Sequence, residues 1–156
     1  MDVGCIACWA KKTRVKWIYK TKYNEHGEFD KHKACLVAKG YTQKHGIDYT
    51  EVYAPVARME TIRMVVALAA QRNWKIFRLD VKSAFLYSEL NEDVYVEQPR
   101  GYKIKGRGDK VYKLHKALYD LKQATRAWFN RMETYFVSEG FKRCPNEQSF
   151  FTKWSK

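Results

Sequence analysis

The sequence has little of what marks secreted, membrane-bound or disordered proteins. It contains three prolines and eight glycines in 156 residues, with no internal repeat or low-complexity tract. No run of about 18 apolar residues could cross a bilayer. The N-terminus lacks the basic segment and long apolar segment of a secretory signal. We therefore expect an intracellular, cytoplasmic or nuclear setting without a membrane partner, and one ordinary domain or part of a larger one.

Cysteine is also scarce. Without a secretory signal, Cys5, Cys8, Cys35 and Cys144 are expected to be reduced thiols. Cys5 and Cys8 have the spacing of a zinc pair, but no second C-x-x-C or H-x-x-x-H pair follows. A structural zinc site needs four ligands, so the pattern favours ordinary cysteines.

Acidic residues are few relative to basic ones. Thirty lysines and arginines stand against 17 aspartates and glutamates, giving a net charge of +13. Such an excess does nothing for the fold but attracts polyanions. Because aromatic residues make up 15% of the chain, phosphate neutralisation and base stacking could act together on a nucleic acid. The alternative is a merely soluble, lysine-coated protein.

The apolar pattern predicts an α+β fold with an antiparallel sheet and packed helices. Alternation predicts a strand with one mostly basic face over 15–23, followed by a turn at 24–27 and a second strand over about 33–39. The remaining elements are predicted as a helix over 60–73, a strand over 74–81, short strands at 94–96 and 111–114, and a helix over 125–139 that ends at Gly140. Residues 1–14 show no period and are expected to form a loose leader.

Asp80 lies late in the apolar stretch 74–81, where a carboxylate is costly unless something pairs with it. A divalent cation is one solution, because magnesium takes one or two protein carboxylates together with substrate phosphates. The alternative is that Asp80 caps a turn or pairs with Arg78 or Lys82.

Polar and basic side chains also gather at the start of the last predicted helix, where Lys122, Gln123 and Arg126 occur. A helix N-terminus offers free backbone N–H groups to phosphate, and nearby cations strengthen that preference. The alternative is an ordinary solvated helix start.

Seven stretches, taken in chain order, resemble the reverse transcriptase of copia-type LTR retrotransposons. They are KWIYK (16–20), KACLVAKGYTQ (33–43), IDY (47–49), APVAR (54–58), LDVKSAFL (79–86), VYVEQP (94–99) and LKQA (121–124). The resemblance covers about 15–156 and implies part of a right-hand polymerase fold. Fingers would occupy about 15–57 and 87–124, and the first part of the palm about 58–86 and 125–156.

The resemblance also implies site residues. Asp80 matches the first catalytic, metal-binding aspartate, with the Val81 carbonyl in the same shell of Mg²⁺ or Mn²⁺. Phe85 matches the aromatic steric gate that favours deoxynucleotides, and Ala84 adjoins it. Gln123 would contact the incoming deoxynucleoside triphosphate. Lys33 would contact the triphosphate's phosphates. RNA template and DNA primer would be contacted by Lys16, Lys20, Lys22, Lys39, Lys122 and Arg126.

The sequence departs from the family pattern in several places. The Tyr-x-Asp-Asp motif that supplies the other metal-binding aspartates does not occur, so we expect no polymerase activity without the remainder of the polyprotein. Cys35 replaces an arginine, Asp120 a glycine and Thr125 a proline. These changes keep open an alternative, a non-catalytic, basic nucleic-acid-binding module left from a decayed element.

A further expectation concerns packing. In the family, later palm strands cover the apolar face of the last helix. We therefore expect Trp128, Tyr135 and Phe136 to lie on an exposed apolar face.

Overall fold

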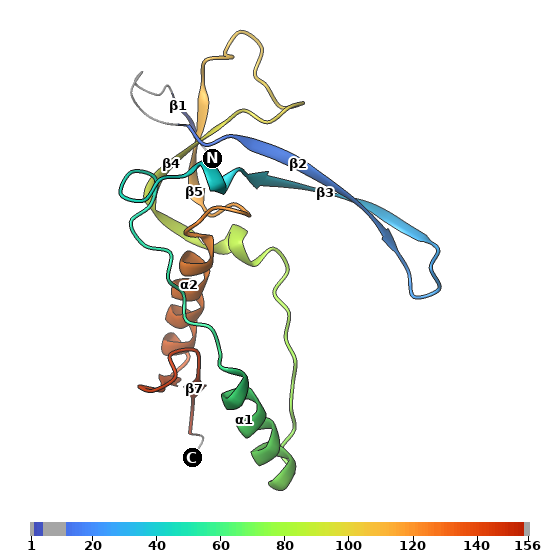
Figure 1. Ribbon diagram of the computed structural model, residues 1–156, viewed down its shortest axis with the longest axis vertical. Helices are drawn as coiled ribbons and strands as arrows, with labels where there is room; N and C mark the ends of the chain where they lie inside the picture. The colour runs from blue at the N-terminus through green and yellow to red at the C-terminus, as the bar shows by residue number, and fades with distance from the viewer. Residues whose placement is uncertain (1, 5–11, 155–156) are drawn as a thin grey trace.

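The computed structural model describes residues 2–4 and 12–154 (Figure 1). It has two α-helices and three small antiparallel sheets, so the predicted α+β class is confirmed. One sheet has the strand order β1-β5-β4, and the other two are the pairs β2-β3 and β6-β7. The bounds are β1 Asp2–Gly4, β2 Val15–Tyr23, β3 Phe29–Ala38, α1 Met59–Gln71, β4 Glu89–Glu97, β5 Val111–Lys116, α2 Ala124–Ser138, β6 Lys142–Arg143 and β7 Phe151–Thr152.

Strands β2 and β3 form a long hairpin that projects from the rest of the molecule (Figure 1). The predicted bounds of β2 are confirmed, and β3 begins four residues earlier than expected. The turn is built by Asn24, whose Oδ1 accepts hydrogen bonds from the N–H groups of His26 (3.0 Å) and Glu28 (2.9 Å). Gly27 completes the turn with φ +80°, a conformation that costs glycine little. The turn chemistry expected from the sequence is therefore present.

The hydrophobic core lies where β4 and β5 meet the chain that leads into α2. Its buried members include Val94 and Val96 from β4, Leu114 from β5, and Leu118 and Leu121 from the connection. Phe85, in the short 3-10 helix η2 (Ala84–Tyr87), packs against this core. One face of this sheet is thus buried, and both strands are longer than the predicted 94–96 and 111–114.

Helix α2 ends as predicted, with Gly140 at φ +82° after its last turn. The expected exposed face is only partly present. The Phe136 ring packs against Phe141 (5.3 Å between centroids) and Phe151 (5.1 Å), which belongs to the small β6-β7 hairpin. Tyr135 remains 59% exposed. The C-terminal hairpin therefore covers part of the face that we expected to be bare.

The prediction of a strand over 74–81 is wrong. These residues are extended and follow α1, but no strand among the described residues pairs with them. Leu79 is 89% exposed and Phe77 is 79% exposed. An alternating apolar sequence needs a neighbouring strand to satisfy its backbone groups, and the described part of the chain does not supply one.

The loose leader expected for residues 1–14 is also wrong in part. Asp2–Gly4 form β1 and pair with β5, and Thr13 forms a bridge to Val96. The Cys5 and Cys8 pair lies outside the described residues. Within 2–4 and 12–154, no helix has the length and apolar character needed to span a bilayer.

Candidate functional site

The β2-β3 hairpin carries a lysine face. Residues directly opposite each other in an antiparallel pair share one face, and two such pairs here are Lys20↔Lys33 and Lys22↔Lys31. All four side chains are exposed. Like charges directly opposite destabilise a hairpin, because their Cβ atoms lie only about 5 Å apart. A polyanion lying on this face would remove that repulsion.

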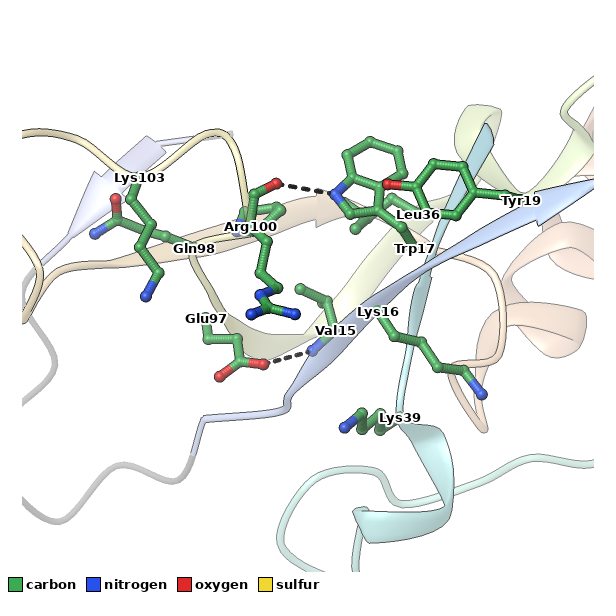
Figure 2. Close-up of a pocket in the computed structure, with 11 residues that line it drawn as sticks. Val15, Lys16, Trp17, Tyr19, Leu36, Lys39, Glu97, Gln98, Arg100 and Lys103 are labelled. Carbon is green, nitrogen blue, oxygen red and sulfur yellow. Dashed lines mark hydrogen bonds between the residues drawn. The ribbon is translucent and has the colours of Figure 1, made fainter. Parts of the chain in front are cut away.

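The other face of the hairpin is aromatic. Trp17 stacks on Tyr19 with 6.5 Å between ring centroids, and Tyr102 tilts against Trp17 at 5.8 Å. The indole Nε1 of Trp17 donates a hydrogen bond to the carbonyl oxygen of Arg100 (3.1 Å), which fixes the ring (Figure 2). Lysine and aromatic side chains therefore occupy opposite faces of one hairpin.

A pocket of about 440 Å³ lies where the base of the hairpin meets the chain after β4 (Figure 2). Lys16, Lys39, Arg100 and Lys103 line it together with Trp17. The Glu97 carboxylate at its wall accepts a hydrogen bond from the backbone N–H of Val15 (3.1 Å). The predicted Lys16 and Lys39 thus share one pocket.

Lys16 also lines a second, more open hollow together with Lys122 and Tyr41. The structure therefore brings together Lys16 with Lys39 and Lys16 with Lys122. It places Lys20, Lys22 and Lys33 further out along the hairpin. Together these residues form a basic strip from the hairpin towards the start of α2.

Gln123 is 2% exposed, and both ends of its amide have protein partners. Its Oε1 accepts a hydrogen bond from Gln43 Nε2 (3.1 Å), and its Nε2 donates to the carbonyl oxygen of Asp48 (3.1 Å). Gln43 Oε1 in turn accepts from the Lys122 N–H (2.9 Å). These bonds hold the chain after β3 against the start of α2. In this conformation both ends of the Gln123 amide are hydrogen-bonded to other residues of the protein.

Arg126 is directed away from the basic strip. Its Nη1 donates a hydrogen bond to the carbonyl oxygen of Tyr53 (3.0 Å), and it lines a hollow that also contains Glu51. The pKa of Glu51 is lowered, first by hydrogen bonds from the Tyr53 and Val52 N–H groups and then by the charges of Arg126 and His45. The structure therefore separates Arg126 from Lys122, although the sequence suggested one cluster.

The nucleotide-gate candidates Ala84 and Phe85 lie in η2 and are half-buried. The Phe85 ring meets Tyr119 edge to face with 5.2 Å between centroids. Ser83, immediately before η2, has φ +56°. Packing thus fixes the position of Phe85 at the edge of the core.

Asp80 and Val81 lie on the extended stretch that follows α1, and both are exposed. Among the described residues, Asp80 makes no hydrogen bond or ion pair with Arg78 or Lys82. In the same ranges, no three His, Cys, Asp or Glu side chains gather where they could hold a metal ion. Two-metal chemistry relies on several converging carboxylates. One carboxylate and one carbonyl do not fit that requirement, so further ligands are needed.

Asp120 adopts the left-handed conformation, with φ +66°. A Cβ on Gly40 would lie 1.8 Å from the Asp120 carbonyl oxygen, so only glycine fits at position 40. A non-glycine residue at positive φ costs about 1–3 kcal/mol. Asp120, which stands where the family pattern has glycine, is therefore strained.

Sequence reasoning missed two residues that shape the site, Gln43 and Gln98. Gln43 lies 80 positions from its partner Gln123, and Gln98 bonds the carbonyl oxygens of Arg107 and Lys110 in the loop between β4 and β5. Gln98 continues the alternation of buried residues at Val94 and Val96, whereas Gln43 lies outside any helix or strand. The hydrogen-bond partners of these two buried amides are visible only in three dimensions.

A family model described as reverse transcriptase (RNA-dependent DNA polymerase) matches residues 9–156. The Retrovirus-related Pol polyprotein from transposon RE1 of Arabidopsis thaliana is 46% identical over 136 residues, 87% of this chain. The corresponding polyprotein from transposon TNT 1-94 of Nicotiana tabacum is 38% identical over 140 residues, 90% of this chain. A Transposon Ty1-ER2 Gag-Pol polyprotein of Saccharomyces cerevisiae is 31% identical over 75% of this chain.

These relatives are much longer than the chain, which spans 9% of the RE1 polyprotein and 10% of the TNT 1-94 polyprotein. No solved structure matches significantly. The resemblance to copia-type retrotransposon enzymes, drawn from motifs in chain order, is confirmed. The chain belongs to the reverse transcriptase (RNA-dependent DNA polymerase) family.

Proposed function

We propose that this chain forms the fingers and the first part of the palm of the reverse transcriptase in a copia-type polyprotein. There it would help to copy RNA template into DNA from a DNA primer. The lysine face of the β2-β3 hairpin, in a chain of this family, is the observation that carries the proposal. Two directly opposed lysine pairs are unfavourable for the free hairpin and favourable beside a phosphate backbone.

Binding is tested by neutralising one opposed pair. The variant Lys20→Gln/Lys33→Gln removes two cations without touching the core. Fluorescence anisotropy measures the affinity for a labelled primer–template across a salt series. The affinity should fall, and the slope of the logarithm of the binding constant against the logarithm of salt concentration should shrink by about 2. The control Arg131→Gln/Lys142→Gln removes two exposed cations from α2 and β6 and should leave the slope almost unchanged. Equal slopes for all three proteins would contradict the proposal.

The polymerase step requires residues beyond those described. In the complete enzyme Asp80 and the Val81 carbonyl would supply one part of a divalent-ion shell, and Mg²⁺ or Mn²⁺ would supply charge neutralisation at the triphosphate. Phe85, held by Tyr119, would present its ring to the sugar of the incoming deoxynucleotide. The chain alone should not extend a primer, because one carboxylate cannot hold the metal ions.

Asp80 is tested in the longer polyprotein polymerase. There Asp80→Asn should abolish primer extension while primer–template affinity stays the same. Asp93→Asn is a matched control, because Asp93 is also exposed and pairs with Lys113 at the surface (2.7 Å). Extension by the Asp80→Asn enzyme at the wild-type rate would remove Asp80 from the mechanism.

The second candidate is a non-catalytic nucleic-acid-binding module of a decayed element. The Gln123 amide, satisfied at both ends by Gln43 and Asp48, favours it. This candidate predicts that deoxynucleoside triphosphate does not change primer–template affinity and that Asp80→Ala has no effect in any form of the protein. A triphosphate-dependent gain in affinity in the longer polymerase would favour the first candidate.

A further inference from the structure

The chain between β4 and β5 carries the densest positive charge outside the hairpin. We define residues 100–110 as the basic loop. Its cations are Arg100, Lys103, Lys105, Arg107 and Lys110, against one carboxylate, Asp109. Four of the five cations are exposed and Lys110 is half-buried. In the part of the chain that the structure describes, no carboxylate forms an ion pair with any of them. An unpaired concentration of charge is therefore held in a single loop.

The basic loop is braced from inside by one buried side chain. Gln98 is 7% exposed, and its Nε2 donates to the carbonyl oxygens of Arg107 (2.7 Å) and Lys110 (2.8 Å). Its Oε1 accepts from the N–H of Ile104 (2.7 Å). Three short bonds from one amide fix the loop's path. The cations are thus presented on an organised scaffold, which lowers the ordering cost of binding a ligand.

The basic loop also meets the aromatic face of the hairpin. The Arg100 carbonyl oxygen accepts the Trp17 indole N–H, and the Tyr102 ring lies against Trp17. In Figure 2, Arg100 and Lys103 lie on the loop side of the 440 Å³ pocket, and Lys16 and Lys39 lie on the hairpin side. Cations from two segments thus line one pocket together with Trp17, whose ring is held by its hydrogen bond to Arg100.

We propose that the basic loop is a second phosphate-binding arm, which with the hairpin holds a single-stranded stretch of nucleic acid over the Trp17 pocket. The inference rests on the proposed function, since it assumes a nucleic-acid partner. Backbone phosphates lie against Arg100 and Lys103, and an unpaired base lies against Trp17. A single strand is favoured over a duplex because only an unpaired base offers its flat face to an aromatic side chain.

The charge part of the proposal is tested with Arg100→Gln/Lys103→Gln. Anisotropy with a labelled single-stranded RNA should show about ten-fold weaker binding at moderate salt. The salt slope should shrink by about 1.4, since a single strand contributes about 0.7 per phosphate neutralised. Binding to a blunt RNA duplex of the same length should change much less. The Arg131→Gln/Lys142→Gln protein again serves as the charge-matched control.

The scaffold part is tested without changing charge. Gln98→Ala should weaken single-strand binding several-fold and speed amide hydrogen exchange in 100–110, while exchange in β4 and β5 stays slow. Trp17→Ala should lose about ten-fold in affinity, and Trp17→Phe should regain most of it because a ring remains.

The outcomes separate this inference from the proposed function. If the loop variants bind single strands like wild type while Lys20→Gln/Lys33→Gln binds weakly, the second arm is overturned and the proposed function stands. If the loop variants lose duplex and single-strand affinity equally, the assignment to a single strand is overturned. If the wild-type chain binds neither nucleic acid, the proposed function itself fails.

Discussion

Two regions of this molecule have similar apolar sequences but very different environments. In β4, β5 and the start of α2, side chains such as Val96 and Leu114 are almost fully buried. In α1 and residues 74–81, side chains such as Ile76, Phe77 and Leu79 are mostly exposed. Both regions contain apolar residues at the spacing of regular structure. The difference is whether a partner segment lies within the described chain, which shows that an apolar pattern specifies a buried face but not what covers it.

The two regions should differ most in how much stability is lost when one leucine in each is replaced by alanine. Leu114→Ala empties space in the core and should lower the free energy of unfolding by about 2–5 kcal/mol. Leu79→Ala removes a side chain that is already in water and should change it by less than about 0.5 kcal/mol. Urea denaturation followed by circular dichroism measures both. Equal losses would mean that residues 74–81 pack in solution.

A smaller effect is expected at the buried amide pair that joins the packed region to the chain after β3. Gln123→Ala removes the hydrogen bonds that its amide makes with Gln43 Nε2 and with the Asp48 carbonyl oxygen, and should cost about 1–3 kcal/mol. Gln148→Ala alters an exposed glutamine and should be nearly neutral. The same denaturation experiment compares them. A neutral Gln123→Ala would show that water replaces the pair without loss.

Relief of backbone strain gives an effect of opposite sign. Asp120→Gly should raise the free energy of unfolding by about 1 kcal/mol, because glycine adopts φ +66° without the Cβ penalty. Asp109→Gly replaces an aspartate whose φ is not positive, and should not stabilise the protein. A gain from Asp109→Gly as large as from Asp120→Gly would point to charge rather than backbone strain.

The smallest effect concerns the attachment of α1 to the C-terminal hairpin. The Glu147 carboxylate accepts hydrogen bonds from Ser149 (2.6 Å) and Thr61 (3.2 Å), and these bonds, Ser149 first, lower its pKa. A lowered pKa in the folded state means stability that is present at neutral pH and lost as pH falls below the ordinary value of 4.5. In Glu147→Gln the free energy of unfolding should therefore fall less steeply with decreasing pH than in wild type.

Hydrogen exchange at α1 provides the check. As pH falls below 4.5, exchange corrected for its intrinsic pH dependence should accelerate in 59–71 for wild type but not for Glu147→Gln. Glu133→Gln is the control, because Glu133 pairs with Arg143 (2.7 Å) away from α1. A change in Glu133→Gln as large as that in Glu147→Gln would assign the effect to general charge loss.

The sequence was sufficient for the elements that are stabilised locally. The hairpin follows from alternation and from the turn at Asn24, and α2 from its period and the stop at Gly140. The motifs in chain order were sufficient for the family. Metal and nucleotide roles for Lys33, Asp80, Val81, Ala84, Phe85 and Gln123 stay predictions, as does the division into fingers and palm.

The rest depended on contacts between distant residues. The alternating apolar residues of 74–81 predicted a strand. Alternation shows which face could be buried, but not whether a neighbouring strand is present to pair with it. The roles of Gln43 and Gln98 were missed because side-chain bonds across a fold leave no period. Arg126 was grouped with Lys122 by proximity in sequence, whereas its guanidinium reaches the Tyr53 carbonyl.

The opposed lysine pairs make the hairpin respond to dissolved salt in two opposite directions. Screening by ions relieves the repulsion between Lys20 and Lys33, so the free hairpin gains stability as ionic strength rises. The same ions compete with a bound polyanion, so affinity declines over that range. Dilute buffer would thus give the least stable free hairpin and the tightest complex. A bound nucleic-acid strand would then screen the lysine pairs as dissolved ions do at higher ionic strength.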